Sequence, residues 1–134
     1  MNLSESISVE EFEHSTTAEK KGIVNKMPIC FYNSAIELCT RVIEPLIRLM
    51  GEKPTILSGY GCTALNIEVG GVSTSQHVKG EAIDITFNQN NNRAWKLLTE
   101  NLYYDQAIAY RKKGFIHISY KKNGNRNQTI IKKN

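Results

Sequence analysis

Two histidines and one aspartate stand at positions from which they could converge on a single metal ion. His77 lies just before the segment EAIDITF (81–87), which carries Asp84, and His117 lies within GFIHISY (114–120). Two imidazoles and a carboxylate are a common donor set of catalytic zinc, in which a fourth position stays open for water and the metal lowers the pKa of that water towards 7. The sequence therefore predicts a Zn²⁺ site with His77, Asp84 and His117 as its ligands.

Strand parity gives this convergence a physical basis. Side chains of a β-strand alternate between its two faces, so residues two apart share a face. In both segments the apolar residues occupy every second position and must face the core, which turns Asp84 and His117 to the opposite face. If the two strands are neighbours, the carboxylate and the imidazole meet there, and His77 can reach them from the preceding loop.

The residues around these ligands form the pattern S-x-H-x-x-G-x-A-x-D, from Ser75 to Asp84. Gly80 would allow the turn that brings His77 back over the strand, and the small Ala82 leaves room beside a metal. A lone aspartate on a strand is usually solvated, and a lone histidine more often has a structural role. The whole pattern, however, has a chance occurrence on the order of 10⁻⁴ in a chain of this length, which favours the metal site.

Several helices are expected to accompany this site. The S/T-x-x-E sequences at 8–11 and 16–19 each predict a short helix that begins with a reciprocal cap. A longer helix is expected from Ser34, with its own S-x-x-E pattern, to Gly51. Pro45 lies inside that helix and lacks a backbone donor, so we expect a kink or a break there.

The remaining segments predict one sheet. PTILSGYG (54–61) is expected to be a buried strand, the glycine- and serine-rich stretch up to His77 a loop, and the asparagine cluster at 88–92 a turn that caps another helix. Three later segments predict an antiparallel meander: DQAIAY (105–110), GFIHISY (114–120) and NQTIIKK (127–133). The expected fold class is therefore α+β, with helices packed beside a mainly antiparallel sheet.

Composition limits the classes of protein that need to be considered. A chain of 134 residues with 40% hydrophobic and 22% charged residues predicts a single domain over 1–134. It contains neither a long apolar run nor a basic, apolar start, so we expect cytoplasmic synthesis without a signal peptide and no membrane association. Three cysteines without CxxC spacing predict free thiols. The net charge of +4 lacks the interleaved aromatic residues of a base-stacking surface, so we expect no nucleic-acid partner.

At the level of motifs, SQHVKGEAIDI followed by GFIHISY resembles the zinc D-alanyl-D-alanine carboxypeptidases, the D-Ala-D-Ala dipeptidases and the L-alanyl-D-glutamate endolysins, particularly their small phage and prophage members. SGYG, DQAIAY and GNRNQ resemble further segments of those proteins in the same order. The resemblance implies a Hedgehog/DD-peptidase-like fold, Zn²⁺ held by His77, Asp84 and His117, and peptidoglycan peptides as substrate. We further expect substrate contacts by Ser75 and Gln76, and a monomer that acts at the bacterial cell wall if it is released.

The chain departs from this family's pattern at two places. Gly61 stands where the family commonly has an arginine that holds substrate or polarises the scissile carbonyl. Gly114 and Tyr110 stand where the family has the carboxylate of the general base. A phenol with an unperturbed pKa near 10 is a poor base at neutral pH, but Tyr110 could donate a hydrogen bond to an oxyanion.

Other acidic residues could replace the missing carboxylate. Asp105 is the candidate base in the stretch before His117, and its alternative is a structural role, either capping the strand or orienting a histidine. Glu68 and Glu81, in or beside the loop, are further candidates. Cys62 could be a hydrolase nucleophile, but we expect it to lack a helix start that would lower the pKa of its thiol.

Two functions remain open from the sequence. The first is a zinc peptidase, either a D-Ala-D-Ala carboxypeptidase or an endopeptidase, that hydrolyses peptidoglycan stem peptides. The second is a catalytically impaired, zinc-containing module that binds cell wall or serves as a phage structural part, having lost the arginine and the carboxylate.

Overall fold

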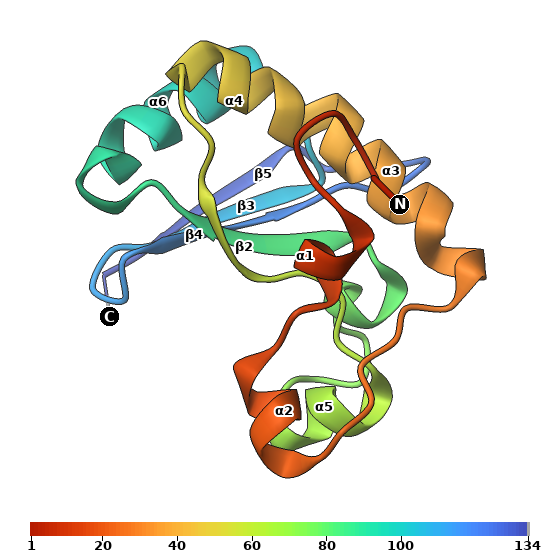
Figure 1. The fold of residues 1–134 in the computed structure, drawn as a ribbon. Coiled ribbons are helices and arrows are strands. Elements are labelled where there is room, and N and C mark those ends of the chain that lie inside the picture. Colours follow the sequence, from red (N-terminus) through yellow and green to blue (C-terminus); the bar gives the residue numbers. More distant parts are fainter. Residues whose placement is uncertain (134) are drawn as a thin grey trace.

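The structure, a computed structural model, describes residues 1–133, so the last residue of the expected domain, 134, lies outside it. Helices lie beside one five-stranded sheet (Figure 1), which confirms the predicted α+β class. The α-helices are α1 (Val9–Glu13), α2 (Thr16–Lys21), α3 (Tyr32–Leu38), α4 (Glu44–Met50), α5 (Thr63–Glu68) and α6 (Asn91–Asn101). The strands are β1 (Thr55–Ser58), β2 (Ala82–Thr86), β3 (Gln106–Tyr110), β4 (Phe115–Ser119) and β5 (Gln128–Lys132). Four shorter helical segments are η1 (Ile29–Phe31), η2 (Cys39–Ile43), η3 (Gln76–Lys79) and η4 (Asn88–Asn90).

The sheet has the strand order β1-β2-β4-β3-β5. Three of its pairings are antiparallel, but β5 runs parallel to β3, so the predicted antiparallel meander is wrong for the last strand. The reason is that β4 already has β2 on one edge and β3 on the other. The chain after β4 therefore cannot pair with β4 and joins the free edge of β3, where it runs in the same direction as β3.

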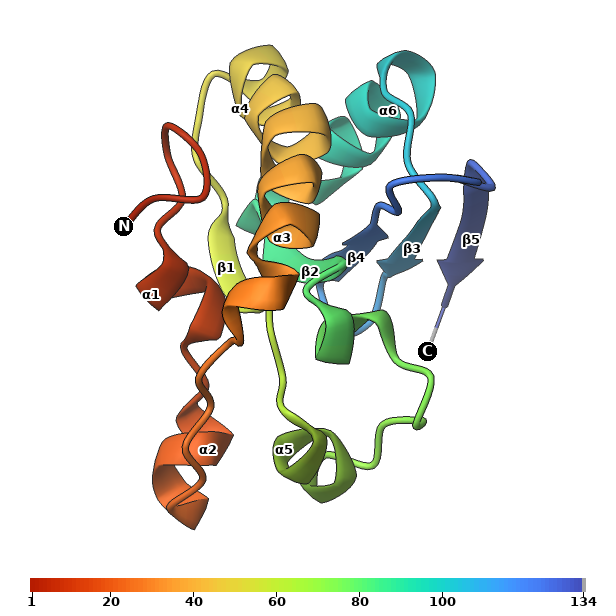
Figure 2. The same cartoon turned by 90° about the vertical axis from the view of Figure 1, so that its right-hand side faces the viewer.

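One face of the sheet carries the main core. Helices α3, α4 and α6 lie over this face, whereas α2 and α5 lie towards the other side (Figures 1 and 2). Fully buried side chains of the core come from both layers: Leu38, Val42, Leu46, Leu98, Ile83, Ile85, Ile116 and Ile118. The apolar parity predicted for the two ligand-bearing strands is thereby confirmed, and their opposite face is left for polar side chains.

The long helix differs from its prediction at the start. It begins at Tyr32, directly after η1, and Ser34 lies inside α3 without capping it. The predicted break at Pro45 is confirmed, because the π-helical turn η2 separates α3 from α4 and Pro45 lies in the first turn of α4. The backbone N–H of Glu44 reaches the carbonyl of Cys39, five residues back, so the wider turn absorbs the break in the helical ladder.

The N-caps predicted for the two short helices α1 and α2 are correct for α1 only. Ser8 and Glu11 form the predicted capping box of α1. The cap of α2 is Ser15 rather than Thr16: its hydroxyl accepts a hydrogen bond from Ala18 N at 3.1 Å. Ser15 has the extended backbone that an N-cap requires, whereas Thr16 is already helical.

Two other predictions in the first half of the chain are wrong. The strand β1 is an edge strand rather than a buried one, and Leu57 within it is 49% exposed, because only β2 pairs with it. The stretch predicted as one loop contains the short helix α5, which buries Leu65. Within residues 1–133, no helix is long and apolar enough to cross a membrane.

The N-terminal segment is attached to the helical layer through one buried carboxylate. Glu44 accepts hydrogen bonds from Ser4 Oγ at 2.6 Å, Ser6 N at 2.7 Å and Ser6 Oγ at 2.9 Å. Burial raises the pKa of Glu44, but the hydrogen bonds from Ser4 and Ser6 outweigh it and leave the pKa below its ordinary value of 4.5. The ionised carboxylate therefore stabilises the fold.

We expect Glu44→Gln to lower the free energy of unfolding by about 1–3 kcal/mol at neutral pH, because an amide cannot accept from all three donors. A lowered folded-state pKa means that the stabilisation is complete above pH 4.5 and is lost as the pH falls below it. Urea unfolding at several pH values measures the difference between the two proteins. Glu37→Gln, which breaks a partly exposed pair with Arg41, is the control and should change stability by less than about 0.5 kcal/mol. A difference at Glu44 that persists unchanged to pH 3 would contradict the role assigned to its charge.

Candidate metal centre

Asp84 and His117 face each other across the centre of the sheet. They are direct partners in the register of β2 and β4. His117 Nδ1 lies 2.9 Å from Asp84 Oδ1, and both side chains are only partly buried. The predicted convergence from neighbouring strands is thus confirmed, and it follows from antiparallel pairing, which sets opposed Cβ atoms about 4.5–5.5 Å apart.

His77 reaches the pair from the turn η3, which ends where Gly80 adopts a positive φ of 72°. A Cβ at Gly80 would approach the carbonyl oxygen of Phe31 to 3.1 Å, so both the backbone angle and the packing favour glycine. His77 Nδ1 lies 2.7 Å from the carbonyl oxygen of Gly59, which points its Nε2 towards Asp84 Oδ1, 3.5 Å away. A backbone acceptor on one ring nitrogen leaves the other free for a metal.

The three side chains fit a zinc ion. Each offers one ligand atom, and these atoms all lie within 4.8 Å of one another. Two imidazole nitrogens and one carboxylate oxygen suit Zn²⁺, which takes three protein ligands in catalytic sites. Burial raises the pKa of Asp84, but hydrogen bonds from His117 and His77 outweigh it and bring the pKa to about 2. Asp84 is therefore ionised at neutral pH, as a metal ligand must be.

A cleft of about 340 Å³ opens beside these ligands. His77, Asp84 and Ser75 line one side of it, next to residues of β1. The other side is formed by the start of α2 and by α5 with its C-cap residue, which add Leu65, Asn66 and Val69. The sequence did not predict α5, although the spacing of Leu65 and Val69, four residues apart, was the available signal for a helical face.

Gly61 lines the same cleft. A Cβ built there would meet only Leu65 Cδ2, at an ordinary contact distance of 3.8 Å. Gly59 is different, because a Cβ there would overlap Phe12. Position 61 therefore has room for a side chain that would reach into the cleft.

Tyr110 lies on the same face of the sheet as His117. It pairs with Phe115 in the register of β3 and β4, and the two rings stack with their centroids 4.6 Å apart. Burial, followed by the negative charge of Asp84, raises the pKa of the Tyr110 phenol. The phenol therefore stays protonated at neutral pH, which suits a hydrogen-bond donor and not a base; its catalytic role stays a prediction.

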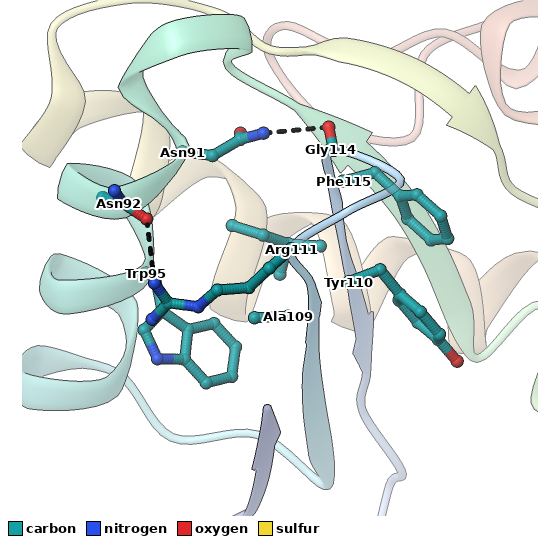
Figure 3. A pocket seen from close by; sticks show the side chains of 9 residues that line it. Asn91, Asn92, Trp95, Ala109, Tyr110, Arg111, Gly114 and Phe115 are labelled. Atoms are coloured by element: carbon teal, nitrogen blue, oxygen red, sulfur yellow. Dashed lines mark hydrogen bonds between the residues drawn. The ribbon is translucent and has the colours of Figure 1, made fainter. Parts of the chain in front are cut away.

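The hairpin that carries Tyr110 is attached to α6 (Figure 3). Asn91 Nδ2 donates to the carbonyl of Gly114 at 2.9 Å, and Arg111 Nη1 lies 3.5 Å from Asn92 Oδ1. These contacts border a second hollow, of about 210 Å³, which none of the three candidate ligands lines. Tyr110 points away from Trp95 in this view, and the hollow is separate from the metal centre.

Asp105 is fully buried and paired with Arg126. Burial raises the pKa of Asp105, but hydrogen bonds from Arg126 and Gln76 outweigh it and bring the pKa to about 2. Among the described residues, its carboxylate contacts none of the three candidate ligands. Its predicted role as a base stays a prediction, and the position of Arg126 was not foreseen.

The structure also places the remaining residues that the sequence suggested for the site, Ser75, Gln76 and Glu68. Ser75 lines the cleft and accepts a hydrogen bond from His77 N at 3.3 Å, whereas Gln76 directs its amide to Asp105 and Glu81. Glu68 pairs with Lys21 at 3.2 Å. The substrate contacts of Ser75 and Gln76 stay predictions.

The three cysteines are free, as predicted. The expectation that Cys62 lacks a helix start is wrong, because it is the N-cap residue of α5. Its side chain makes no capping hydrogen bond, and its backbone N–H donates to Asn25 Oδ1 at 2.7 Å.

A family model described as Peptidase M15 matches residues 5–119, which include the cleft and all three candidate ligands. No curated protein matches the chain.

We expect zinc to stabilise the metal-free protein through His77, Asp84 and His117. At a free zinc concentration 100 times the dissociation constant, the gain in unfolding free energy should be about 2.7 kcal/mol. Thermal and urea unfolding with and without zinc measure it, and Asp84→Asn or His117→Ala should abolish it. His14→Ala is the control, because His14 is the remaining histidine and contacts Glu19 on the surface instead. An equal zinc response in wild type and Asp84→Asn would rule out this site.

Proposed function

Since the chain belongs to the peptidase M15 family, whose members are zinc-dependent and act on peptidoglycan peptides, we propose that it hydrolyses the stem peptides of bacterial peptidoglycan. The reaction would be that of a D-Ala-D-Ala carboxypeptidase or of an endolysin-type endopeptidase. The observation that carries the proposal is the group His77, Asp84 and His117, two of whose members, His77 and Asp84, line a cleft large enough for part of a peptide. All three ligands come from one chain, which supports a monomer as the active unit.

Zn²⁺ bound by these residues would polarise the scissile carbonyl and lower the pKa of a water towards 7. The chain itself orients the ligands: Gly59 holds the ring of His77, and Asp84 stays ionised between the two histidines. Leu57, Leu65 and Val69 offer apolar contacts along the cleft for the side chains of a peptide.

Tyr110 is proposed as a donor to the oxygen that becomes negative in the transition state. Its phenol is protonated at neutral pH and it shares the face of His117, as that role requires. Asp105 was the sequence candidate for the base, but its carboxylate already accepts from Arg126 and Gln76. That environment favours a supporting role over proton transfer.

A second candidate function is a zinc-containing module that binds the cell wall, or a phage structure, without cutting it. The observation in its favour is that Gly61, Gly114 and Tyr110 stand where the resemblance places an arginine and a carboxylate. Both functions need the metal site. They differ only in whether a product forms.

We expect the zinc-loaded protein to convert purified muropeptides into shorter peptides, detected by chromatography and mass spectrometry. A chelator or His117→Ala should reduce the rate by more than about 100-fold, since a Lewis acid contributes several kcal/mol to the transition state. His14→Ala should behave as wild type. Zinc binding without a product from several muropeptides would contradict the peptidase and favour the binding module.

The position of Gly61 allows a test by gain of function. Because the cleft has room there, Gly61→Arg should place a cation beside the substrate and raise the turnover of muropeptides by about 10-fold or more. Gly61→Ala, which adds only a methyl group, is the matched control and should leave the rate unchanged. Zinc affinity, measured in parallel, should be the same in all three proteins. A slower Gly61→Arg enzyme with intact zinc binding would show that this side of the cleft receives no negative charge.

A further inference from the structure

We propose that Asp105 and Arg126 are positioning residues of the metal centre, and that they act through Gln76 and Ser119, which adjoin the two histidine ligands. The inference rests on the metal site of the proposed function and assigns no catalytic step to either residue. It follows from the contacts that the buried carboxylate makes and from the elements that those contacts join.

Asp105 lies next to both segments that carry a histidine ligand. Gln76, which directly precedes His77 in η3, donates its side-chain amide to Asp105 Oδ2 at 3.1 Å. Ser119, two residues after His117 and on the same face of β4, lies 3.4 Å from the same oxygen through its hydroxyl. A backbone hydrogen bond joins the same two residues, because Asp105 N donates to the carbonyl of Ser119 at 2.8 Å. One carboxylate therefore links the turn of His77 to the strand of His117.

Arg126 makes this link possible. A fully buried carboxylate is costly unless it is paired and hydrogen-bonded. Arg126 donates from Nε to Oδ1 at 3.0 Å and from Nη2 to Oδ2 at 2.8 Å, and its backbone N–H donates to Oδ1 at 3.1 Å. This bidentate pairing fixes the orientation of the carboxylate plane and favours the ionised form of the carboxyl group. With Arg126 in place, Oδ2 remains directed at Gln76 and Ser119.

The turn η3 needs such support more than the strands do. Asp84 and His117 are held by the ladder of the sheet, whereas His77 lies on a four-residue turn after a stretch of exposed residues, 70–74. On one side, Gly59 and Gly61 hold this turn, through His77 Nδ1 and the carbonyl of His77. On the other side, the Gln76 side chain holds it through Asp105 and Glu81. Zinc sites tolerate ligand distances only within about 0.2 Å, so a loosened turn weakens metal binding.

Arg126 lies beyond residues 5–119, the part of the chain that the family model matches. It stands in the connection between β4 and β5, which also carries Lys121, whose Nζ lies 3.8 Å from Asp105 Oδ1. This connection thus supplies the positive charge for a carboxylate that supports the metal centre. The residues that determine zinc affinity accordingly extend past the matched region.

The test measures zinc affinity by competition with a chromophoric chelator, at a temperature at which circular dichroism shows every variant to be folded. Gln76→Met removes the amide that joins η3 to Asp105 but leaves the pair of Asp105 with Arg126 intact. We expect it to weaken zinc binding by about 10- to 100-fold, the usual effect of losing an outer partner of a ligand. Its melting temperature without metal should stay close to that of wild type.

Arg126→Gln should weaken zinc binding to a similar extent, and Arg126→Lys should restore part of it, because lysine keeps the charge but not the bidentate geometry. Lys122→Gln removes an exposed charge from the same connection and is the matched control, which should bind zinc as wild type does. Gln76→Met combined with Arg126→Gln should be little worse than either variant alone, since both break the same link.

Two outcomes would overturn the proposal. One is an unchanged zinc affinity of the folded Gln76→Met protein. The other is an Arg126→Gln protein that loses melting temperature without losing zinc affinity, which is what a purely structural ion pair predicts. Wild type that binds zinc but cuts no muropeptide would refute the peptidase and leave this test intact, whereas wild type that binds no zinc would refute both.

Discussion

The cross-strand pairing of Asp84 with His117 is the constraint on which the rest of the site depends. Antiparallel register makes these two residues direct partners, and the apolar residues on either side of each fix which way they face. A slip of one residue in either strand would move its polar side chain into the core and bring an isoleucine to the opposite face. The hydrophobic layer beneath α3, α4 and α6 therefore specifies the candidate metal site as firmly as it specifies the fold.

The third candidate ligand, His77, is held by a turn and by hydrogen bonds and not by strand pairing. His77 has no strand to fix it, and its place depends on a tight turn, a positive φ at Gly80 and a few hydrogen bonds from either side. The backbone just after β1 contributes through Gly59 and Gly61, and the far side contributes through Gln76 and the buried carboxylate of Asp105. The centre thus combines one rigid half, built on the sheet, with one half whose geometry is set by polar contacts.

The periodicity of the sequence was sufficient to predict the rigid half of the centre, Asp84 and His117. The alternation of apolar residues gave the faces of β2 and β4, and the pattern from Ser75 to Asp84 gave the turn before them. The parallel placement of β5 was not foreseen, because local patterns do not show that both edges of β4 are already occupied. Arg126 was missed for a related reason: a partner 21 residues from Asp105 leaves no periodic signal. The helix α5 was missed because glycine and serine dominate its surroundings and its own apolar face is short.

The distance along the chain between the ligands has a consequence for biosynthesis. Asp84 and His117 are separated by 33 residues, and the partner of Asp105 follows later still. A ribosome releases the chain from its N-terminus, so His77 and Asp84 emerge well before the residues that complete their geometry. During that interval the nascent chain offers only two of the three candidate donors. The complete set of three candidate donors therefore exists only after β4 has inserted between β2 and β3.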